Sequence, residues 1–482
     1  MINELKRKYS GLPIQVKASF WFFICSFMQK GISVITTPIF TRLLSTEEYG
    51  KLSVFNSWLG IISIFVSLNL FAGVYNQGLV KFEDDRKVYS STLQGLTLFL
   101  VLSWTAIYFL FRNFWNELFL LTTVQMLAML LMVWTSAVFN FWAAEQRVQF
   151  RYKSLVVLTL IISVAKPTVG IFLVLHAEDK VTARILGLAI VEAVAYTGLF
   201  FTQMLRGRHF FSKKYWKHAL LFNIPLIPHY LSQTILNSAD RIMIKNMVGD
   251  GPAGIYGLAY SISQIITLLN TALLQTMNPW IYKKIKNRQV SDIQRVAYSA
   301  LILIALANLA LIAVAPEAVS LFAPDNYYEA IWVIPPVAMS VFFQFSYSLF
   351  ANFAFYYEKT KLIATASILG AALNIFLNYV FIPIFGYYAA GYTTLVCYMV
   401  YAVFHYCCMR IICRKYMDNV KVYNLKSLLS IAGGFAVVGF LFLTTYKMPV
   451  VRYGLLAFSL IVVIFMHEKL IGIAKRIIRI KK

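Results

Sequence analysis

The chain has 482 residues, of which 60% are hydrophobic and 13% are charged, and its formal net charge is +24. The apolar residues run in stretches long enough to cross a bilayer, which excludes a water-soluble protein and predicts a polytopic membrane protein. The positive charge requires no nucleic acid partner, because anionic head groups at the inner face of a membrane attract basic segments.

About 14 apolar stretches divide the chain almost end to end. A helix needs roughly 20 apolar residues, each rising about 1.5 Å, to cross about 30 Å of hydrocarbon. In chain order, the predicted spans are Ala18–Thr41, Leu52–Tyr75, Ser90–Phe111, Leu118–Trp142, Leu155–His176, Ala183–Leu205, Ala219–Val248, Gly254–Met277, Val296–Leu321, Ala330–Phe355, Leu362–Phe385, Tyr387–Met409, Leu428–Tyr446 and Val450–Met466. The sequence therefore predicts an all-α polytopic membrane protein.

Lysine and arginine are distributed unevenly between the two sides of these spans. With the N-terminus inside, 33 of the 44 Lys and Arg residues lie in cytoplasmic segments and 7 lie on the opposite side. Short loops rich in Lys and Arg stay in the cytoplasm. The charges therefore predict that both termini and the loop Arg206–His218 are cytoplasmic, while Pro316–Glu329 is outside.

The outer loops are short, and none exceeds roughly 15 residues. The sequence contains no nucleotide-binding loop, no HExxH or GxSxG motif, and no paired carboxylates in an outer loop. Membrane enzymes that transfer glycans on lipid carriers need catalytic carboxylates on long outer loops. We therefore expect a transporter without catalytic residues, cofactor or metal, rather than an enzyme.

An internal repeat supports transport. Tyr49-Gly50-x-Leu52 corresponds to Tyr256-Gly257-Leu258 at an offset of about 207 residues, and each Tyr-Gly pair follows a polar-studded helix and a short outer loop. Six predicted helices separate the two copies, so both have the same orientation in the membrane. Repeats of this kind are related by an axis along the membrane normal, and the substrate path lies between them.

Three segments resemble a known family. They are TPIFTRLLSTEEYGKLSVFNSW (Thr37–Trp58), NIPLIPHYLSQTILNSADRIMIKNMVGDGPAGIYGLAYSIS (Asn223–Ser263), and YYEKTKLIATASILGAALNIFLNYVFIPIFGYYAAGYTT (Tyr356–Thr394). Together they resemble the polysaccharide-transporter branch of the multidrug/oligosaccharidyl-lipid/polysaccharide (MOP) exporter superfamily, and in particular O-antigen and capsule-type oligosaccharide flippases. The segments lie in order, so the resemblance covers essentially the whole chain.

The resemblance implies two six-helix lobes related as parallel repeats. Residues 1–210 would hold spans 1–6, residues 211–412 would hold spans 7–12, and residues 413–482 would form a C-terminal helix pair with a basic tail. The lobes would rock between inward-open and outward-open states, which is alternating access.

The resemblance also implies a substrate and a location. The substrate would be an oligosaccharide on undecaprenyl diphosphate, moved across the bacterial cytoplasmic membrane with coupling to H⁺, Na⁺ or the membrane potential. Membrane lipids and other polysaccharide assembly proteins would be its partners, without nucleic acid. A small-molecule or drug antiporter on the same fold is the alternative, and a membrane-embedded glycan polymerase is a further one.

Charged residues inside the predicted spans mark candidate sites. Each costs roughly 2.5–3.5 kcal/mol at a helix centre on insertion scales, so each is expected to face the bundle interior or water. These residues are Lys30, Lys166, Arg241, Lys245, Glu192 and Asp240. Lys166 and Glu192 both lie about 13–17 Å deep and could form a pair, either structural or functional. Pro167 beside Lys166 is a candidate hinge.

The seventh span is too polar for a helix that faces lipid. Pro225 and Pro228 predict a bend or hinge in it. His229 is a candidate for proton coupling or for a hydrogen-bonded cavity residue, and Asn237 is a further cavity candidate. Asp240 is expected either to pair with another helix or to lock against Arg241.

The net charge of the predicted cavity discriminates between substrates. Four cations against two anions leave a positive cavity, which suits a diphosphate because that charge cannot enter a low-dielectric space unpaired. A drug exporter would need carboxylates and few fixed cations. We predict that Lys30 and Arg241 bind the diphosphate directly, while Lys245 and Arg42 tune the field along the path.

Overall fold

The computed structural model describes residues 13–289 and 291–465, and every regular element in these ranges is a helix. The chain divides into two compact units, Met1–Ser238 and Ala239–Lys482. The first unit contains α2 (Ile14–Leu43), α3 (Thr46–Ser67), α4 (Gly73–Lys81), α5 (Arg86–Leu110), α6 (Arg112–Phe119), α7 (Thr123–Val148), α8 (Tyr152–His176), α9 (Lys180–Gly207), α10 (Lys213–Asn223), the 3₁₀ helix η1 (Ile224–Leu226) and the first half of α11 (Ile227–Met247).

The second unit begins within α11, and its further helices share the apolar character of the first. They are α12 (Asp250–Ser263), η2 (Gln264–Ile266), α13 (Thr267–Lys286), α14 (Ser291–Ala313), α15 (Ala315–Phe322), η3 (Asp325–Trp332), α16 (Ile334–Tyr356), α17 (Thr360–Phe385), α18 (Tyr388–Tyr416), α19 (Leu425–Thr444) and α20 (Pro449–Phe465).

Twelve helical segments in the described ranges are long and apolar enough to cross a membrane. They confirm the prediction of an all-α, polytopic membrane protein. Two of the predicted spans fall outside this set for different reasons: α11 is rich in polar residues, and α20 has only 17 residues. The described part of α12, η2 and α13 forms one continuous segment, Asp250–Lys286.

The backbone at each end of α3 corrects both predicted boundaries of the second span. α3 begins at Thr46 rather than Leu52, because Ser45 and Glu48 form a reciprocal capping box. It ends at Ser67 rather than Tyr75, because Leu68 and Asn69 adopt left-handed backbone conformations with φ of 50° and 51°.

The helix α7 is also displaced from its predicted span. It begins at Thr123, where Thr122 and Gln125 form a second capping box, and the predicted start at Leu118 lies in the separate helix α6. It continues to Val148, six residues beyond the predicted end at Trp142. This extension places Glu145 inside the helix.

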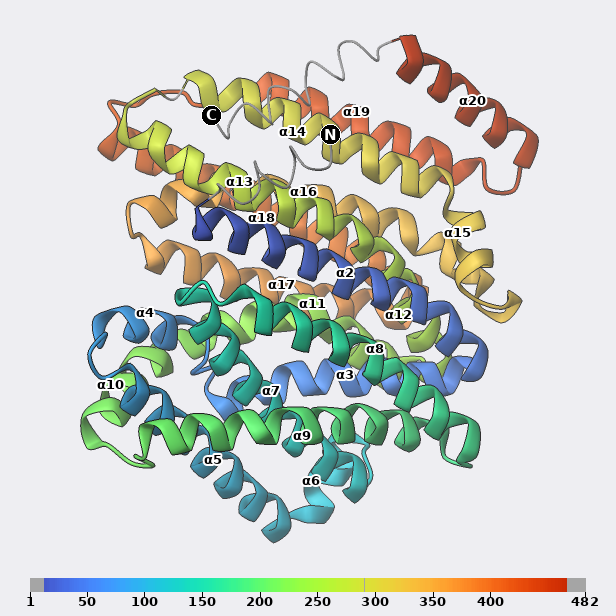
Figure 1. Cartoon of the computed structure of the whole chain (residues 1–482). Coiled ribbons are helices and arrows are strands. Elements are labelled where there is room, and N and C mark those ends of the chain that lie inside the picture. Colours follow the sequence, from blue (N-terminus) through green and yellow to red (C-terminus); the bar gives the residue numbers. More distant parts are fainter. Residues whose placement is uncertain (1–12, 290, 466–482) are drawn as a thin grey trace, which may run out of the picture. The chain divides into compact units, whose positions relative to one another are not determined.

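The long helices of the first unit run alongside one another (Figure 1). α9 packs against α5, α7 and α8. Its contact with α8 is close at two glycines: a Cβ built on Gly187 would lie 2.9 Å from the Cα of Gly170. Only small residues allow two helix backbones to approach in this way, so these glycines fix the distance between α8 and α9.

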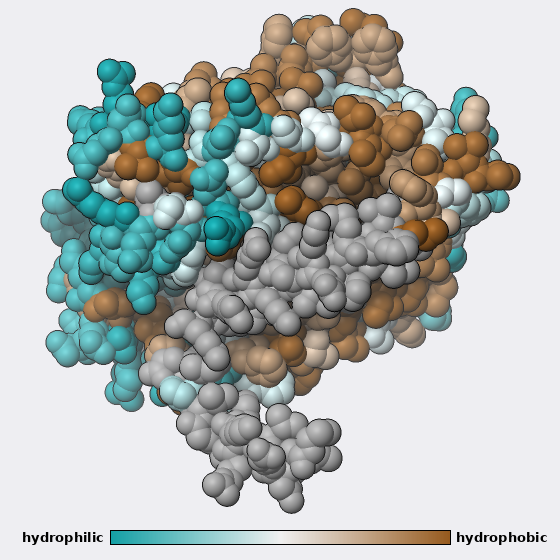
Figure 2. Space-filling view, turned by 90° about the horizontal axis from the view of Figure 1, so that it is seen from above, coloured by the Kyte–Doolittle hydropathy of each residue, from teal (hydrophilic) through white to brown (hydrophobic). Residues whose placement is uncertain are grey.

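The core of the second unit is built around α16, which packs against α14, α18 and α19. Phe342, Phe345 and Phe353 on α16 are almost completely buried. Figure 2 shows one face of the molecule, where hydrophilic side chains gather at one end and hydrophobic side chains cover much of the rest. An apolar surface beside a polar end is expected of helices that cross a bilayer.

The predicted span Ala219–Val248 is divided in the structure. α10 ends at Asn223, η1 follows, and α11 starts at Ile227. Pro225 lies in η1 and Pro228 in the first turn of α11, where a missing backbone N–H costs least. The Asn223 amide is fully buried and donates to the carbonyls of Leu68 and Asn69, at 2.8 and 2.9 Å.

Candidate functional site

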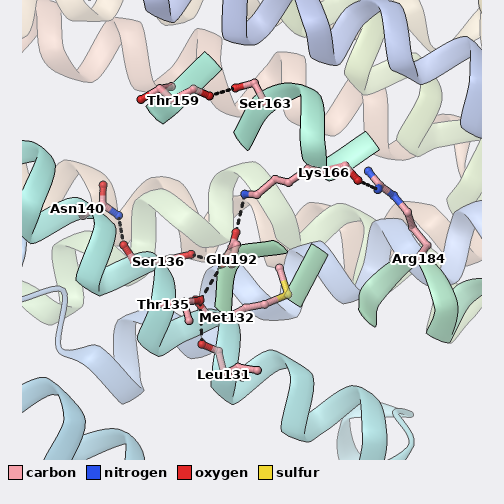
Figure 3. A network of polar contacts seen from close by, with 10 residues as sticks. All are labelled: Leu131, Met132, Thr135, Ser136, Asn140, Thr159, Ser163, Lys166, Arg184 and Glu192. Atoms are coloured by element: carbon pink, nitrogen blue, oxygen red, sulfur yellow. Dashed lines mark hydrogen bonds and ion pairs between the residues drawn. The ribbon is translucent and has the colours of Figure 1, made fainter. Parts of the chain in front are cut away.

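Lys166 and Glu192 form the centre of a polar network in the first unit. The Lys166 Nζ of α8 lies 2.6 Å from Glu192 Oε1 of α9, and Glu192 is only 4% exposed. The second carboxylate oxygen accepts hydrogen bonds from Thr135 at 2.9 Å and Ser136 at 3.1 Å, both on α7. Figure 3 shows these side chains converging on the carboxylate. The prediction that Lys166 and Glu192 meet is confirmed.

A second cation reaches the same network from the first turns of α9. It is Arg184, whose Nη1 donates to the Lys166 carbonyl at 3.0 Å (Figure 3). Its guanidinium carbon lies 3.8 Å from the centre of the Phe40 ring on α2. A Cβ on Gly170 would lie 2.0 Å from Arg184 Nη1, so this glycine makes room for the guanidinium. Pro167 lies within the continuous helix α8.

Asp240 is the centre of a second buried network. It is 1% exposed and accepts hydrogen bonds from Tyr256 at 2.6 Å, Asn378 at 2.6 Å and Thr394 at 2.8 Å. These donors belong to α12, α17 and α18, so four helices of the second unit meet at this carboxylate. All three donors are neutral. Asp240 therefore bonds to other helices, which is the first of the two arrangements that the sequence predicts for it.

The polar side chains of α17 and α18 extend the Asp240 network. Thr393 donates to the Asn378 side chain, and Asn378 lies 3.4 Å from Asn374, one helical turn away. The asparagines were visible in the sequence as an i, i+4 pair in an apolar helix, yet only the fold connects them to Asp240. Neutral oxygen and amide groups thus surround one buried carboxylate.

Arg241 and Lys245 lie near the C-terminal end of α11 and have different neighbours. The Arg241 guanidinium carbon lies 4.5 Å from the centre of the Tyr260 ring, and the residue is half-buried. Lys245 Nζ is 3.6 Å from Asp250, and its side chain is 11% exposed. The charge of Lys245 is thus already partly neutralised by a carboxylate from the start of α12.

Lys30 is exposed in the middle of α2, thirteen residues before Leu43, and it has no ion pair with any described residue. Arg42 lies in the last turn of the same helix, is exposed, and donates to the Pro38 carbonyl at 2.9 Å. The two cations therefore mark the middle and the predicted outer end of one apolar helix.

His229 and Asn237 lie on α11 and are both half-buried. The Asn237 amide donates to the Gln233 carbonyl one turn earlier, at 2.8 Å. The His229 ring lies 5.9 Å from the ring of Tyr230. Both of these contacts are local to α11.

The sequence analysis missed two charged residues that lie inside helices. Glu145 falls after the predicted end of its span at Trp142, whereas the structure places it within α7, and Arg184 was not named as a candidate although it lies within the predicted span Ala183–Leu205 and in α9. A predicted span that is defined only by a run of apolar residues ends where polar residues begin, although the helix itself can continue beyond that point. In the described ranges, no group of three or more His, Cys, Asp and Glu side chains could hold a metal ion.

Known proteins match both the sequence and the arrangement of helices. Residues 16–285 match the profile of the family described as polysaccharide biosynthesis protein, which is more than half of the chain. The chain belongs to this family. Residues 225–380 also match the profile described as MatE. The family resemblance predicted from the three segments is thereby confirmed.

Individual relatives agree with this assignment. The chain is 24% identical over 389 residues to the Lsg locus putative protein 1 of Haemophilus influenzae, covering 74% of this chain and 89% of that protein. Among solved structures, the lipid II flippase MurJ in an inward closed conformation gives a TM-score of 0.68 at 13% identity, covering 93% of this chain and 99% of MurJ.

A multidrug resistance MATE family transporter of the MOP superfamily, in an inward-facing conformation, shares the same fold. Its TM-score is 0.60 at 14% identity, with 81% of this chain and 96% of that chain covered. The polysaccharide biosynthesis family member described here therefore has the helical fold of MOP transporters.

Proposed function

We propose that this protein is a flippase that moves an undecaprenyl-diphosphate-linked oligosaccharide, such as an O-antigen or capsule unit, from the inner to the outer leaflet of a bacterial cytoplasmic membrane. Family membership and the MOP transporter fold support transport. A solved protein of this fold is named as a lipid II flippase. Alternating access would carry the head group across while the lipid tail stays in the bilayer.

The observation that carries the proposal is the position of Lys30. A lysine in the middle of an apolar helix costs roughly 2.5–3.5 kcal/mol on insertion scales. Lys166 and Lys245 each lie beside a carboxylate, Glu192 and Asp250 respectively. Lys30, by contrast, has no described ion pair. A diphosphate that enters the site would neutralise Lys30 and gain charge-assisted hydrogen bonds.

Arg241 is the second proposed ligand. Its guanidinium is held against Tyr260, and its planar fork can bind two phosphate oxygens at once. It lies six residues before Met247, which is about 9 Å along α11, whereas Lys30 lies about 20 Å before the end of α2. Lys245 and Arg42 would tune the field near the exit.

Asp240 is the proposed coupling residue of the second unit. A buried carboxylate whose described hydrogen bonds all come from neutral donors can bind H⁺, or can coordinate Na⁺ in place of one of those donors. Either ion would change the hydrogen bonds that link α11 to α12, α17 and α18. His229, Asn237 and the Lys166–Glu192 pair remain secondary candidates, and Pro167, Pro225 and Pro228 remain candidate hinges.

Export of surface glycan tests the phosphate site. Lys30→Ala and Arg241→Gln should each remove surface glycan at a normal level of membrane protein, while Lys361→Ala, an exposed control, should not. Arg241→Lys should be more damaging than Lys30→Arg, because lysine cannot reproduce the bidentate fork. Normal glycan from Lys30→Ala would refute the assignment. So would rescue of Arg241→Gln by Asp240→Asn, which would mean that the two residues only neutralise each other.

One observation favours the antiporter alternative. Residues 225–380 also match the MatE profile, and this range contains the buried Asp240. A carboxylate of this kind suits a cationic substrate. Efflux of a fluorescent organic cation from vesicles that contain the purified protein would support the antiporter. No efflux from these vesicles, together with loss of surface glycan from cells that lack the protein, would support the flippase.

A further inference from the structure

Exposed aromatic side chains continue from a membrane-spanning helix into the segment that joins α9 to α10. Phe99 is 50% exposed on α5, which is long and apolar enough to cross a membrane, so this ring faces the lipid chains. The Trp216 ring of α10 lies 5.6 Å from the Phe99 ring. Phe211 packs edge-on against Trp216 at 4.8 Å and is 59% exposed. These three rings form an aromatic strip that leads from the lipid-facing side of α5 to the residues just before α10.

Backbone contacts hold the aromatic strip in a fixed position. Arg208 ends α9 in a left-handed conformation, with φ of 54°. The following residues lie against α5 at Gly95, where an added Cβ would collide with the Phe210 carbonyl. The Trp216 indole N–H donates to the Thr92 carbonyl of α5 at 3.0 Å. The rings are therefore presented to the surroundings by a well-packed segment.

The same segment is strongly basic. From position 206 to position 223 the sequence contains no Asp or Glu and five Lys or Arg residues. All five side chains are exposed, and none of them forms an ion pair with a described residue. These residues are Arg206, Arg208, Lys213, Lys214 and Lys217. The positive charge beside the aromatic strip is therefore not compensated by a described carboxylate.

Two of these lysines share a helix face near the aromatic strip. Lys213 and Lys217 are one turn apart on α10, and Trp216 is three residues after Lys213, so their side chains are neighbours on the helix surface. Lys214 is directed elsewhere, because its Nζ lies 5.4 Å from the centre of the Phe82 ring at the end of α4. An apolar strip and a pair of cations thus adjoin each other at the edge of α10.

A ligand that matches both features has hydrocarbon chains joined to an anionic phosphate. The chains would lie along the aromatic strip, while Lys213 and Lys217 would form charge-assisted hydrogen bonds with the phosphate oxygens. A zwitterionic head group fits less well, because its own cation is repelled by the lysines. Each basic residue near a membrane surface strengthens the attraction to anionic lipid by about fivefold.

We infer that residues 206–217, together with the adjoining surface of α5, form a binding site for an anionic phospholipid of the bilayer. The charge distribution predicts that this end of α5 and α9 is cytoplasmic, so the lipid comes from the inner leaflet. The bound lipid neutralises Lys213 and Lys217 and holds α10 against α5. This lipid is a constituent of the membrane and not the transported molecule, so the inference does not depend on the proposed transport.

Quenching of tryptophan fluorescence by brominated lipids can locate this phospholipid. The purified full-length chain is placed in phosphatidylcholine vesicles that contain the same small fraction of either brominated phosphatidylglycerol or brominated phosphatidylcholine. Brominated phosphatidylglycerol should quench more strongly, because it collects beside Trp216. Comparison with Trp216→Phe gives the part of this difference that Trp216 carries, and that part should be most of it.

A double variant tests the charges while Trp216 is retained. Lys213→Gln with Lys217→Gln should weaken the attraction for phosphatidylglycerol by about 30-fold and remove the difference in quenching. Both lysines are exposed, so the fold should persist. Lys421→Gln with Lys426→Gln is the matched control, because it removes the same charge from exposed positions of the second unit and should leave the difference unchanged.

Four results would overturn the inference. Equal quenching by the two brominated lipids would mean that no anionic lipid collects at Trp216. A difference that survives in the Lys213 and Lys217 double variant would exclude these lysines as ligands, and loss of the difference in the control variant would assign it to net charge alone. Loss of the difference when inorganic phosphate replaces chloride at constant ionic strength would assign the site to a free anion. Because the vesicles contain no oligosaccharide lipid, the outcome is independent of the proposed diphosphate site.

Discussion

Arg452 of α20 and Glu317 of α15 form a bidentate ion pair in the second unit. Arg452 Nη1 lies 3.0 Å from Glu317 Oε2, and Nη2 lies 2.5 Å from Oε1. The Arg452 side chain is 4% exposed and the Glu317 side chain 42%. The fork geometry makes this a specific attachment of the last described helix to the short helix α15.

Acid should weaken this attachment. Burial raises the pKa of Glu317, but hydrogen bonds from Tyr453, from its own backbone and from Arg452, together with the charge of Arg452, outweigh burial and lower the pKa overall. A lowered carboxyl pKa contributes stability that is present above the unfolded value of about 4.3 and is lost as pH falls through the folded value. Thermal unfolding in detergent should therefore show a loss of stability on acidification that Glu317→Gln reduces.

The size of this effect is modest because Glu317 is partly exposed. Glu317→Gln should cost about 1 kcal/mol at neutral pH, since solvent screens the pair. Asp325→Asn is the control, because Asp325 is exposed at the start of η3, the element that follows α15. An acid dependence that Asp325→Asn reduces as much as Glu317→Gln would contradict the prediction.

Variants of Lys166 and Glu192 can show whether this ion pair serves the stability of the protein or its transport function. Lys166→Met leaves Glu192 buried without its cation and should destabilise the protein by roughly 3–5 kcal/mol. The double variant Lys166→Met with Glu192→Gln should recover most of that stability. Unfolding in detergent and export of surface glycan should be measured together. Recovery of stability without recovery of export would assign the pair a functional role, whereas recovery of both would make it structural.

Gly187 and Gly198 on α9 provide a matched pair for the helix contact. Gly187→Ala should destabilise the first unit by about 1–3 kcal/mol, because its Cβ would meet the Gly170 backbone at 2.9 Å. Gly198→Ala has open space around its Cβ and should be neutral or stabilising by up to about 1 kcal/mol. Thermal unfolding of the two variants should separate them, and equal midpoints would argue against close packing of α8 and α9.

The predicted topology can be tested by labelling. Lys214 and Asp325 are both exposed, so cysteines there should react once the reagent reaches them. In intact cells with a permeabilised outer membrane, an impermeant thiol reagent should label Asp325→Cys and not Lys214→Cys. After the cytoplasmic membrane is opened, both should be labelled. The reverse pattern in intact cells would invert the orientation.

The sequence predicted the class of fold because the apolar stretches and the charge asymmetry are strong signals. It also predicted the Lys166–Glu192 contact, since two opposite charges at similar depth in apolar helices have few other partners. It did not reveal the donors around Asp240, because Tyr256, Asn378 and Thr394 come from helices distant in sequence. Glu145 was missed for a different reason: the helix α7 continues past Trp142, the predicted end of the span.

The buried Asn223 amide has a practical consequence for experiments on this protein. It ties the end of α10 to the turn at Leu68 and Asn69, and Gly207 and Gly95 hold the preceding segment so closely that a Cβ would meet backbone oxygens of Lys87 and Phe210 at 2.2 Å. An epitope tag or a fiducial fusion inserted between α9 and α10 should therefore disturb folding, although this segment lies outside the spans. The exposed turn at 287–289 is a better place for such an insertion.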